Sequence, residues 1–372
     1  MKNQILLYGN TRNSADIRYF AGVSIHDDFF CFSKNGRRCA LLSPLEIGRA
    51  RRTSHLDEIF DYSEVCAAMP KKTPKNYFEA AAFLLRKSGI RRLVVPSDFP
   101  ALVLQKLLER GFDVEICDGE IFPERRRKTE EELAEISKAN DVASACFELA
   151  EEILRSSKID GGVLHYKGAV LTSEFLRAEI EKLAISLDAD ALDTIAASGV
   201  QACDPHEVGH GAVAANSLIV FDIFPRLRSS GYFGDMTRTF LKGEPSKKQA
   251  KLVEAVLDAQ SLAMSKIRAG VDGATVHSAV AERFENGGYF TKLSRGHWNG
   301  FFHSTGHGLG LEVHESPSLG ARECVLAAGD VVTVEPGLYY RNIGGCRIED
   351  NVAVCQDGAR LLSHYHYNWI ID

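Results

Sequence analysis

The alternation of apolar and polar residues predicts helices and strands in turn along the first third of the chain. A helical period runs through residues 75–87 and again through 101–110, and the first of these patterns stops at Gly89. Shorter apolar runs predict strands at residues 17–23, 29–33, 39–43, 92–96 and 113–117. This succession is typical of a small α/β domain with helices packed on a sheet.

The remaining two thirds of the chain carry stronger helix signals and several isolated apolar runs. Thr129 and Glu132 have capping-box spacing, and apolar residues recur at helical spacing from residue 133 to 154. Further capped helices are expected at residues 174–187 and 250–268. Strands are expected at residues 194–197, 217–222, 235–241, 331–335 and 346–354. Helices and strands are therefore mixed here as well, which predicts an α+β domain.

Charge divides the chain at a basic stretch, residues 124–128. Residues 1–128 hold 22 Lys and Arg against 16 Asp and Glu, a net charge of +6. Because the whole chain carries −6, the remainder carries −12. We place the domain boundary between residues 125 and 126, giving domains 1–125 and 126–372. The arginines at 49, 51 and 52 are interpreted as a solvated face, so no nucleic-acid partner is expected.

Composition places the chain among folded globular proteins. Of its 372 residues 45% are hydrophobic and 25% charged, close to the globular average. No apolar run is long enough to span a membrane, and residues 5–8 are too short for a signal-peptide core, so no membrane partner is expected. The nine cysteines include no C-x-x-C pair, which indicates reduced thiols and a cytoplasmic protein without a disulfide framework.

Four carboxylates stand at the ends of apolar strands. The predicted strand at 217–222 ends on Asp222 and the next begins at Asp235, so the two are expected opposite each other on paired strands. Glu335 and Glu349 repeat this arrangement around a turn, with Arg347 on the same strand face as Glu349. Carboxylates this close repel each other unless a cation lies between them or one is protonated.

Three histidines, His303, His307 and His314, fall within twelve positions in a glycine-rich segment that cannot form a stable helix. Carboxylates with an imidazole suit Mn²⁺, Co²⁺, Fe²⁺ or Zn²⁺ better than Ca²⁺. Four carboxylates and one imidazole exceed the needs of one tetrahedral zinc ion and suit two metal ions that share ligands and a water molecule.

At these residues the sequence resembles the creatinase, prolidase and methionine aminopeptidase family of metallopeptidases. The resemblance covers nearly the whole chain and implies a pita-bread catalytic domain preceded by a smaller creatinase-type α/β domain. It implies two divalent metal ions, Mn²⁺ or Co²⁺ before Zn²⁺ or Fe²⁺. By the matching motifs Asp222 chelates one ion, His307 and Glu335 bind the other, and Asp235 and Glu349 bridge both.

The same resemblance implies roles for the remaining candidates. His314 and His206 match histidines that contact the substrate and assist catalysis, and His303 matches a further histidine of the proline-specific members. Arg347 is expected to bind substrate, and Glu335 to take and return a proton. Family dipeptidases often carry an arginine where this chain has Ser318, which weakens the case for a dipeptidase, although Arg322 lies nearby.

We therefore expect an Xaa-Pro aminopeptidase or dipeptidase that hydrolyses the amino-terminal Xaa-Pro bond of short peptides with a hydroxide held between two metal ions. The relatives also imply a homodimer. Two alternatives share the fold: a metal-independent creatinase-like hydrolase, and an inactive binding module. A third follows from the literal H-E-x-x-H at residues 206–210, which is the zincin pattern. Pro205, Gly209 and Gly211 oppose the helix that a zincin needs.

Overall fold

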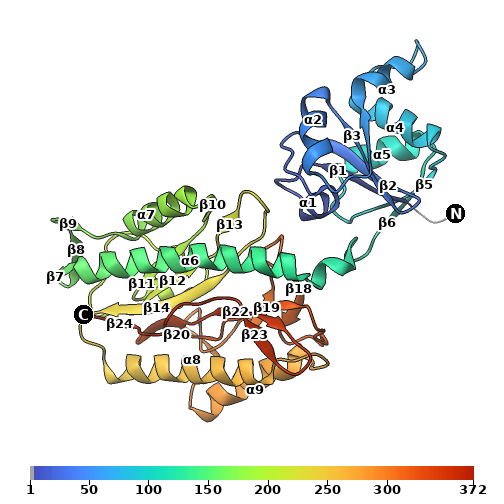
Figure 1. Ribbon diagram of the computed structural model, residues 1–372. Coiled ribbons are helices and arrows are strands. Elements are labelled where there is room, and N and C mark those ends of the chain that lie inside the picture. The colour runs from blue at the N-terminus through green and yellow to red at the C-terminus, as the bar shows by residue number, and fades with distance from the viewer. Residues whose placement is uncertain (1–3) are drawn as a thin grey trace. The chain divides into compact units, whose positions relative to one another are not determined.

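The computed structural model describes residues 4–372 and divides the chain into two compact units, Met1–Arg125 and Arg126–Asp372. Figure 1 shows a smaller unit of sheet and short helices, in blue and cyan, and a larger unit that contains the long helices. Among the described residues no helix has the length and apolar character needed to cross a membrane.

The amino-terminal unit contains a mixed six-stranded sheet with the strand order β4-β3-β2-β1-β5-β6. Its strands are β1 (Gln4–Gly9), β2 (Phe29–Lys34), β3 (Arg37–Leu42), β4 (Glu58–Asp61), β5 (Arg92–Val95) and β6 (Asp113–Ile116). Its helices are α1 (Ala15–Ala21), α2 (Pro44–Thr53), α3 (Tyr62–Ala68), α4 (Tyr77–Lys87) and α5 (Ala101–Glu109). Helices α1 and α2 belong to one apolar cluster on the sheet, and α3, α4 and α5 to the other. Both faces of this sheet are therefore covered.

One expected strand of this unit is wrong, because residues 17–23 lie in and just after helix α1. The Ser14 side chain accepts a hydrogen bond from the Ile17 amide and caps the helix, and Gly22 ends it in the left-handed conformation. Ile17, Phe20 and Ala21 are buried together, at the three- and four-residue spacing of one helix face. The capping residue Ser14 was the sequence signal for a helix, but the short apolar run at residues 17–23 also fits a strand.

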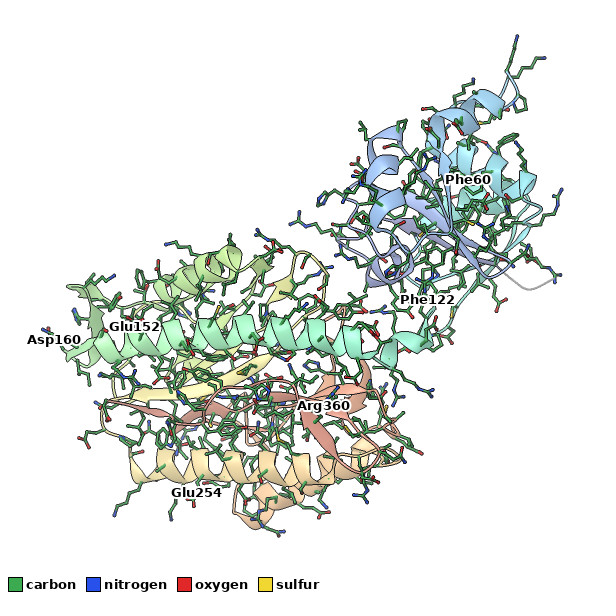
Figure 2. The ribbon with its side chains drawn as sticks, in the orientation of Figure 1. Phe60, Phe122, Glu152, Asp160, Glu254 and Arg360 are labelled. Carbon is green, nitrogen blue, oxygen red and sulfur yellow. The ribbon has the colours of Figure 1, made fainter. Side chains whose placement is uncertain are left out.

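The carboxy-terminal unit is layered, with helices on both sides of its strands. Its helices are α6 (Glu130–Ser156), α7 (Ser173–Ser186), α8 (Lys247–Lys266) and α9 (Gly273–Asn286). Figure 1 shows α6 on one side of the strands, with α8 and α9 on the other. Helices α6 and α7 share an apolar cluster with β-strand residues such as Phe221 and Phe240, and a second cluster contains α8 and α9. Glu152 on α6 and Glu254 on α8 are exposed on the outer faces (Figure 2).

Two sheets and a hairpin lie between these helices. The first sheet has the order β11-β12-β14-β24 and the second has the order β18-β17-β19-β22-β23. The first consists of β11 (Ile195–Ser198), β12 (Ile219–Ile223), β14 (Met236–Lys242) and β24 (Ile370–Ile371). The second consists of β17 (Gly306–Gly308), β18 (Glu315–Leu319), β19 (Val331–Val334), β22 (Asp350–Val354) and β23 (Ala359–Leu361). The hairpin is β20 (Gly337–Tyr340) with β21 (Gly344–Arg347).

Shorter strands complete the unit at its periphery. They are β7 (Lys158–Asp160), β8 (Val163–Tyr166), β9 (Ala169–Val170), β10 (Ala189–Asp190), β13 (Arg226–Leu227), β15 (Lys292–Ser294) and β16 (His297–Asn299). The capping boxes expected for α6 and α8 are both formed, by Thr129 with Glu132 and by Ser246 with Gln249. Each satisfies amides that the helix start leaves without partners.

Two details of the expected strands are corrected by the register. Asp222 on β12 lies opposite Thr237 on β14 and not opposite Asp235, which precedes β14. Asp235 is two residues from Thr237 and is thus a diagonal neighbour of Asp222 on the same face. The expected strand 346–354 is two strands, since β21 pairs with β20 while β22 belongs to the second sheet. The chain leaves the hairpin and joins the sheet at Ile348 and Glu349.

Candidate metal centre

A cavity of about 1000 Å³ opens in the carboxy-terminal unit at the meeting point of the two sheets and the hairpin. All nine candidate residues line it: His206, Asp222, Asp235, His303, His307, His314, Glu335, Arg347 and Glu349. Asp222 lies in β12, His307 in β17 and Arg347 in β21. Asp235, Glu335 and Glu349 occupy the residues just before β14, just after β19 and just before β22. Strand ends from separate parts of the sequence thus deliver their side chains to one space.

Asp235, His307 and Glu349 form the tightest group. Each offers one ligand atom, and these atoms lie within 4.8 Å of one another. His307 Nε2 is 3.7 Å from Asp235 Oδ2 and 3.4 Å from Glu335 Oε1. His307 Nδ1 lies 3.1 Å from the Gly308 carbonyl, to which it donates its proton, so Nε2 faces the carboxylates as a bare acceptor. This is the tautomer that a metal-binding imidazole requires.

The carboxylates of this group are buried and destabilise one another. Burial raises the pKa of Asp235 and Glu349 well above the usual range, and neighbouring carboxylates raise them further. Burial together with Asp222 raises the pKa of Glu335 to about 7, against the opposing effect of Arg347. In the metal-free protein the group therefore retains protons near neutral pH, whereas a divalent cation would stabilise the ionised forms.

Asp222 carries a second sign that a cation fits here. Its Oδ2 atom accepts a hydrogen bond from Arg347 Nη2 at 2.7 Å, but its Oδ1 atom is buried and has no hydrogen-bond partner among the described residues. A buried carboxylate oxygen without a partner is costly. The orphaned oxygen, the excess of carboxylates and the bare imidazole nitrogen together fit a site for divalent cations.

Arg347 is the cation that the protein itself contributes to this space. Its Nη1 atom donates to the Tyr339 hydroxyl at 3.0 Å and to the Pro205 carbonyl at 3.3 Å, and its Nε atom donates to Thr237 Oγ1 at 3.2 Å. With Asp222 on Nη2, all three guanidinium nitrogens are engaged, and the side chain is 3% exposed. Arg347 thus holds protein groups in place.

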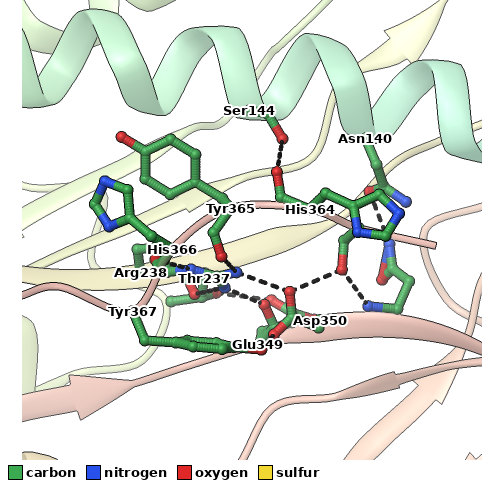
Figure 3. Close-up of polar contacts among 12 residues, drawn as sticks. Asn140, Ser144, Thr237, Arg238, Glu349, Asp350, His364, Tyr365, His366 and Tyr367 are labelled. Atoms are coloured by element: carbon green, nitrogen blue, oxygen red, sulfur yellow. Dashed lines mark hydrogen bonds and ion pairs between the residues drawn. The ribbon is translucent and has the colours of Figure 1, made fainter. Parts of the chain in front are cut away.

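Behind the cavity, Arg238 fixes the backbone that carries Glu349. Figure 3 shows its guanidinium among strand and carboxy-terminal groups. It donates to the carbonyls of Thr237 and Glu349 through Nη1 and to Asp350 Oδ1 through Nη2. It also donates to the carbonyls of Tyr365 and His366. Its charge is balanced by Asp350, which is fully buried.

Thr237 connects Arg238 to the carboxylate of Glu349 in the cavity. Its hydroxyl donates to Glu349 Oε2 at 2.7 Å, and its carbonyl accepts from the Glu349 amide at 3.0 Å. The sequence analysis did not identify Thr237, Arg238, Asp350 or Tyr339. Strand alternation was the available signal for Thr237, because it stands two residues after Asp235 and therefore points to the same face.

The other three histidines occupy different parts of the cavity. His303 is half-buried and its Nε2 lies 2.9 Å from the Tyr339 hydroxyl; desolvation and the nearby Arg347 lower its pKa to about 3. The His314 ring contacts the His307 ring edge to face, with centroids 4.2 Å apart. His206 is exposed and follows Pro205, whose carbonyl accepts from Arg347.

The zincin pattern is not realised. Residues 206–210 form a turn and irregular chain and no helix. Only His206 of its two histidines lines the cavity; His210 is exposed and pairs with Glu207 at 3.4 Å. Neither Ser318 nor Arg322 lines the cavity, although Ser318 is the cross-strand partner of His307.

Comparisons with known proteins identify the family of the chain. A model of metallopeptidase family M24 matches residues 134–356, more than half of the chain. An uncharacterized peptidase of Staphylococcus aureus is 27% identical over 94% of this chain and 92% of its own length. The uncharacterized peptidase YqhT of Bacillus subtilis is 32% identical over 68% of this chain and 69% of its own.

Solved structures with the same fold cover nearly the whole chain. The prolidase from Pyrococcus furiosus has a TM-score of 0.79 and 27% identity, covering 98% of this chain and 97% of that one. The Xaa-Pro dipeptidase from Bacillus anthracis has a TM-score of 0.82 and 26% identity, covering 99% and 94%. An X-Pro aminopeptidase from Thermotoga maritima, at 23% identity and a TM-score of 0.82 over 99% and 97%, shares the fold.

The architecture is therefore that of a two-domain peptidase with a pita-bread catalytic domain. The chain belongs to metallopeptidase family M24. Members of this family use divalent metal ions, and the cluster of Asp235, His307 and Glu349 offers a place for one. The expected fold class and enzyme class are confirmed.

The raised pKa of Glu335 predicts that the metal-free protein loses stability as pH rises. Its carboxyl binds a proton more tightly in the folded state, from a usual value of 4.5 to about 7, so stability falls as pH rises through this window. Glu335→Gln should therefore stabilise the metal-free protein by about 1–3 kcal/mol at pH 7.5 and by much less at pH 5. Urea unfolding in the presence of chelator measures this difference. A Glu335→Gln variant that is less stable than the parent at pH 7.5 would contradict it.

Proposed function

We propose that this protein is a dinuclear metal-dependent peptidase that hydrolyses the bond between an amino-terminal residue and a following proline. One observation carries the proposal: Asp222, Asp235, His307, Glu335 and Glu349 line a single cavity together with His206, His303 and His314. The prolidase from Pyrococcus furiosus and the Xaa-Pro dipeptidase from Bacillus anthracis, both above 25% identical, support the choice of proline peptides.

The protein residues would hold two cations in the following way. Asp222 would bind one ion, His307 and Glu335 the other, and Asp235 and Glu349 both. The mix of carboxylates with one imidazole favours Mn²⁺ or Co²⁺ and also accepts Zn²⁺ or Fe²⁺. When bound, such ions supply an activated water and polarise the scissile carbonyl.

The remaining chemistry belongs to the side chains. Glu335 would take a proton from the attacking water and return it to the leaving nitrogen. His314 and His206 would donate hydrogen bonds to the developing oxyanion and to the peptide. His303 is held by the Tyr339 hydroxyl beside the apolar Phe302 ring, which contacts Tyr339 at 5.3 Å between centroids. Phe302 and Val313 also line the cavity and offer apolar surface to a prolyl ring.

The two alternatives on the same fold need no complete ligand set. A creatinase-like hydrolase works without metal, and a binding module works without catalysis. Neither alternative accounts for four carboxylates gathered around one cavity. Such a cluster destabilises the protein unless cations bind to it. We also propose that the protein works in the cytoplasm, since all nine cysteines are free thiols.

Removing metal should abolish peptidase activity. We expect chelator to reduce hydrolysis of an Xaa-Pro peptide to background, and Mn²⁺ or Co²⁺ to restore it. Asp235→Ala and Glu349→Ala should each lose both ions, because each residue would bridge them; metal analysis of the purified variants measures this. Full activity of either variant in metal-free buffer would contradict a dinuclear centre.

Substitution of two glutamates, Glu335 and Glu207, distinguishes the proposed metal centre from a zincin site. Glu335→Gln should lower kcat by at least a hundredfold, because it removes both a ligand and a proton acceptor. Glu207→Gln should retain appreciable activity, since Glu207 contacts His210 and the Gly209 amide outside the cavity lining. Steady-state kinetics measure kcat for the two variants. A larger loss of kcat in Glu207→Gln than in Glu335→Gln would favour the H-E-x-x-H site.

We further propose that the protein is a homodimer. The support is the charge division between residues 1–128, at +6, and the rest of the chain, at −12. A two-fold arrangement would repeat each contact between opposite charges twice. Light scattering should then give about twice the chain mass of 41.0 kDa at micromolar concentration. A mass of one chain with full activity would contradict the dimer.

A further inference from the structure

We propose that the amino-terminal unit contains a binding site for small oligophosphates, the chemistry that inorganic pyrophosphate shares with the diphosphate group of a nucleotide. The site is a second cavity, of about 1120 Å³, and every residue that lines it belongs to the unit Met1–Arg125. It shares no residue with the cavity of the metal centre, so the two sites can be tested separately.

The lining of this second cavity is strongly positive. Among the described residues it contains five cations and one carboxylate, that of Glu124, which gives a formal charge of +4. The cations are Lys34, Arg37, Arg38, Arg91 and Arg92. A concave surface with this charge attracts anions and repels cations.

Two chain segments bring these cations to the two sides of strand β1. Lys34, Arg37 and Arg38 lie in the hairpin of β2 and β3. Arg91 directly precedes β5, and Arg92 is its first residue. Because β1 pairs with β2 on one side and with β5 on the other, the two segments are about 10 Å apart at the backbone. Their long side chains can therefore reach one elongated anion at the beginning of β1.

Three of the five cations are balanced only in part. Lys34 and Arg37 share one carboxylate, that of Glu58, at 3.4 and 3.7 Å. Arg92 pairs with Asp113 at 3.1 Å, but the two side chains are 62% and 68% exposed. An ion pair exposed to this extent contributes little free energy, so the Arg92 guanidinium can exchange Asp113 for a ligand.

Arg38 is half-buried, and its charge has no carboxylate partner among the described residues. Its guanidinium lies over the rings of Tyr19 and Phe20, at 5.4 and 5.7 Å from the centroids. It donates to the backbone carbonyls of the same two residues, each at 3.4 Å. Asp57 accepts a hydrogen bond from the Arg38 amide and none from the guanidinium. A cation that is partly removed from water and held in place without a counterion favours the binding of an anion.

Arg91 supplies a free cation on the other side of β1. Its side chain is exposed and forms no ion pair within the described part of the chain. Arg38 and Arg91 therefore provide two uncompensated guanidinium groups, one from each of the segments that flank β1. An anion that meets both must carry more than one charged group.

The kind of cation favours phosphate groups. Four of the five cations are arginines, whose planar donors match two oxygens of one phosphate at the same time. The volume of about 1120 Å³ is slightly above the range of about 300–1000 Å³ that is typical of ligand sites. A single phosphate ion would leave most of this space to water, whereas an oligophosphate can contact both groups of arginines.

An apolar side of the cavity stands next to the cations. It is formed by Ile5, Phe20, Ile90 and Phe122, the last of which is labelled in Figure 2. The rings of Phe20 and Phe122 lie 5.9 Å apart between centroids. An apolar surface beside cations accepts the organic part of a phosphate ester, which pyrophosphate lacks and a nucleotide possesses.

Isothermal titration calorimetry on the full chain tests the site, with pyrophosphate, ADP, sulfate and citrate as probes and no divalent ion in the buffer. We expect pyrophosphate and ADP to bind with micromolar Kd at low ionic strength, at least about tenfold more tightly than sulfate or citrate, and more weakly as salt is added. A lower Kd for ADP than for pyrophosphate would identify a nucleotide as the ligand, and equal values would identify the inorganic oligophosphate.

Two substitutions locate the binding. Arg91→Gln removes an exposed cation with little effect on folding and should raise the Kd for pyrophosphate at least about fivefold. Arg38→Met keeps an apolar side chain over the two aromatic rings and should raise the Kd further. Arg51→Gln removes the same charge from an exposed position on α2 outside the cavity and should leave the Kd within about twofold. Bound pyrophosphate should also slow amide hydrogen exchange at residues 33–38 and 89–92.

Three results would overturn this proposal. The first is a Kd above the millimolar range for both oligophosphates, and the second is tighter binding of citrate than of pyrophosphate. The third is an equal effect of Arg91→Gln and Arg51→Gln, which would assign the binding to the net charge of the unit. None of these results bears on the proposed peptidase function, because Arg38, Arg51 and Arg91 lie outside the metal-centre cavity.

Discussion

Mutual repulsion among buried carboxylates is the constraint around which the carboxy-terminal unit is organised. Asp235 and Glu349 are nearly inaccessible to solvent, and Asp222 and Glu335 face them across the same cavity. Protons can relieve this repulsion in the metal-free protein, and cations can relieve it more completely. The rest of the unit has to hold the four groups together against a force that would separate them.

That restraint comes from charged and hydroxyl side chains on both sides of the strands. On the cavity side, Arg347 pairs with Asp222, and Thr237 donates to Glu349. On the far side, Arg238 joins the backbone of Thr237 to that of Glu349. Donor groups that fix metal ligands tune both their position and their affinity for the ion. The two arginines therefore act as supports of the site while contributing positive charge near it.

The sequence predicted the content of the site better than its geometry. Motifs, spacing and the family resemblance identified nine of the residues that line the cavity, because chemistry-bearing residues at strand ends leave a pattern along the chain. They did not identify Thr237, Arg238, Asp350 or Tyr339, whose roles depend on which strands become neighbours. The offset between Asp222 and Asp235 was missed for the same reason, since register depends on the loop between strands. Helix α1 was mistaken for a strand because seven residues contain fewer than two full periods.

The contacts of Arg238 with residues 365 and 366 have a consequence for folding. Two of the acceptors of this guanidinium are carbonyls of Tyr365 and His366, and β24 joins the first sheet beside β14 through Leu241 and Ile370. A chain without residues 365–371 contains every carboxylate of the cluster but leaves the buried Arg238 guanidinium with unpaired donors. The catalytic unit therefore needs residues 365–371 to complete its fold.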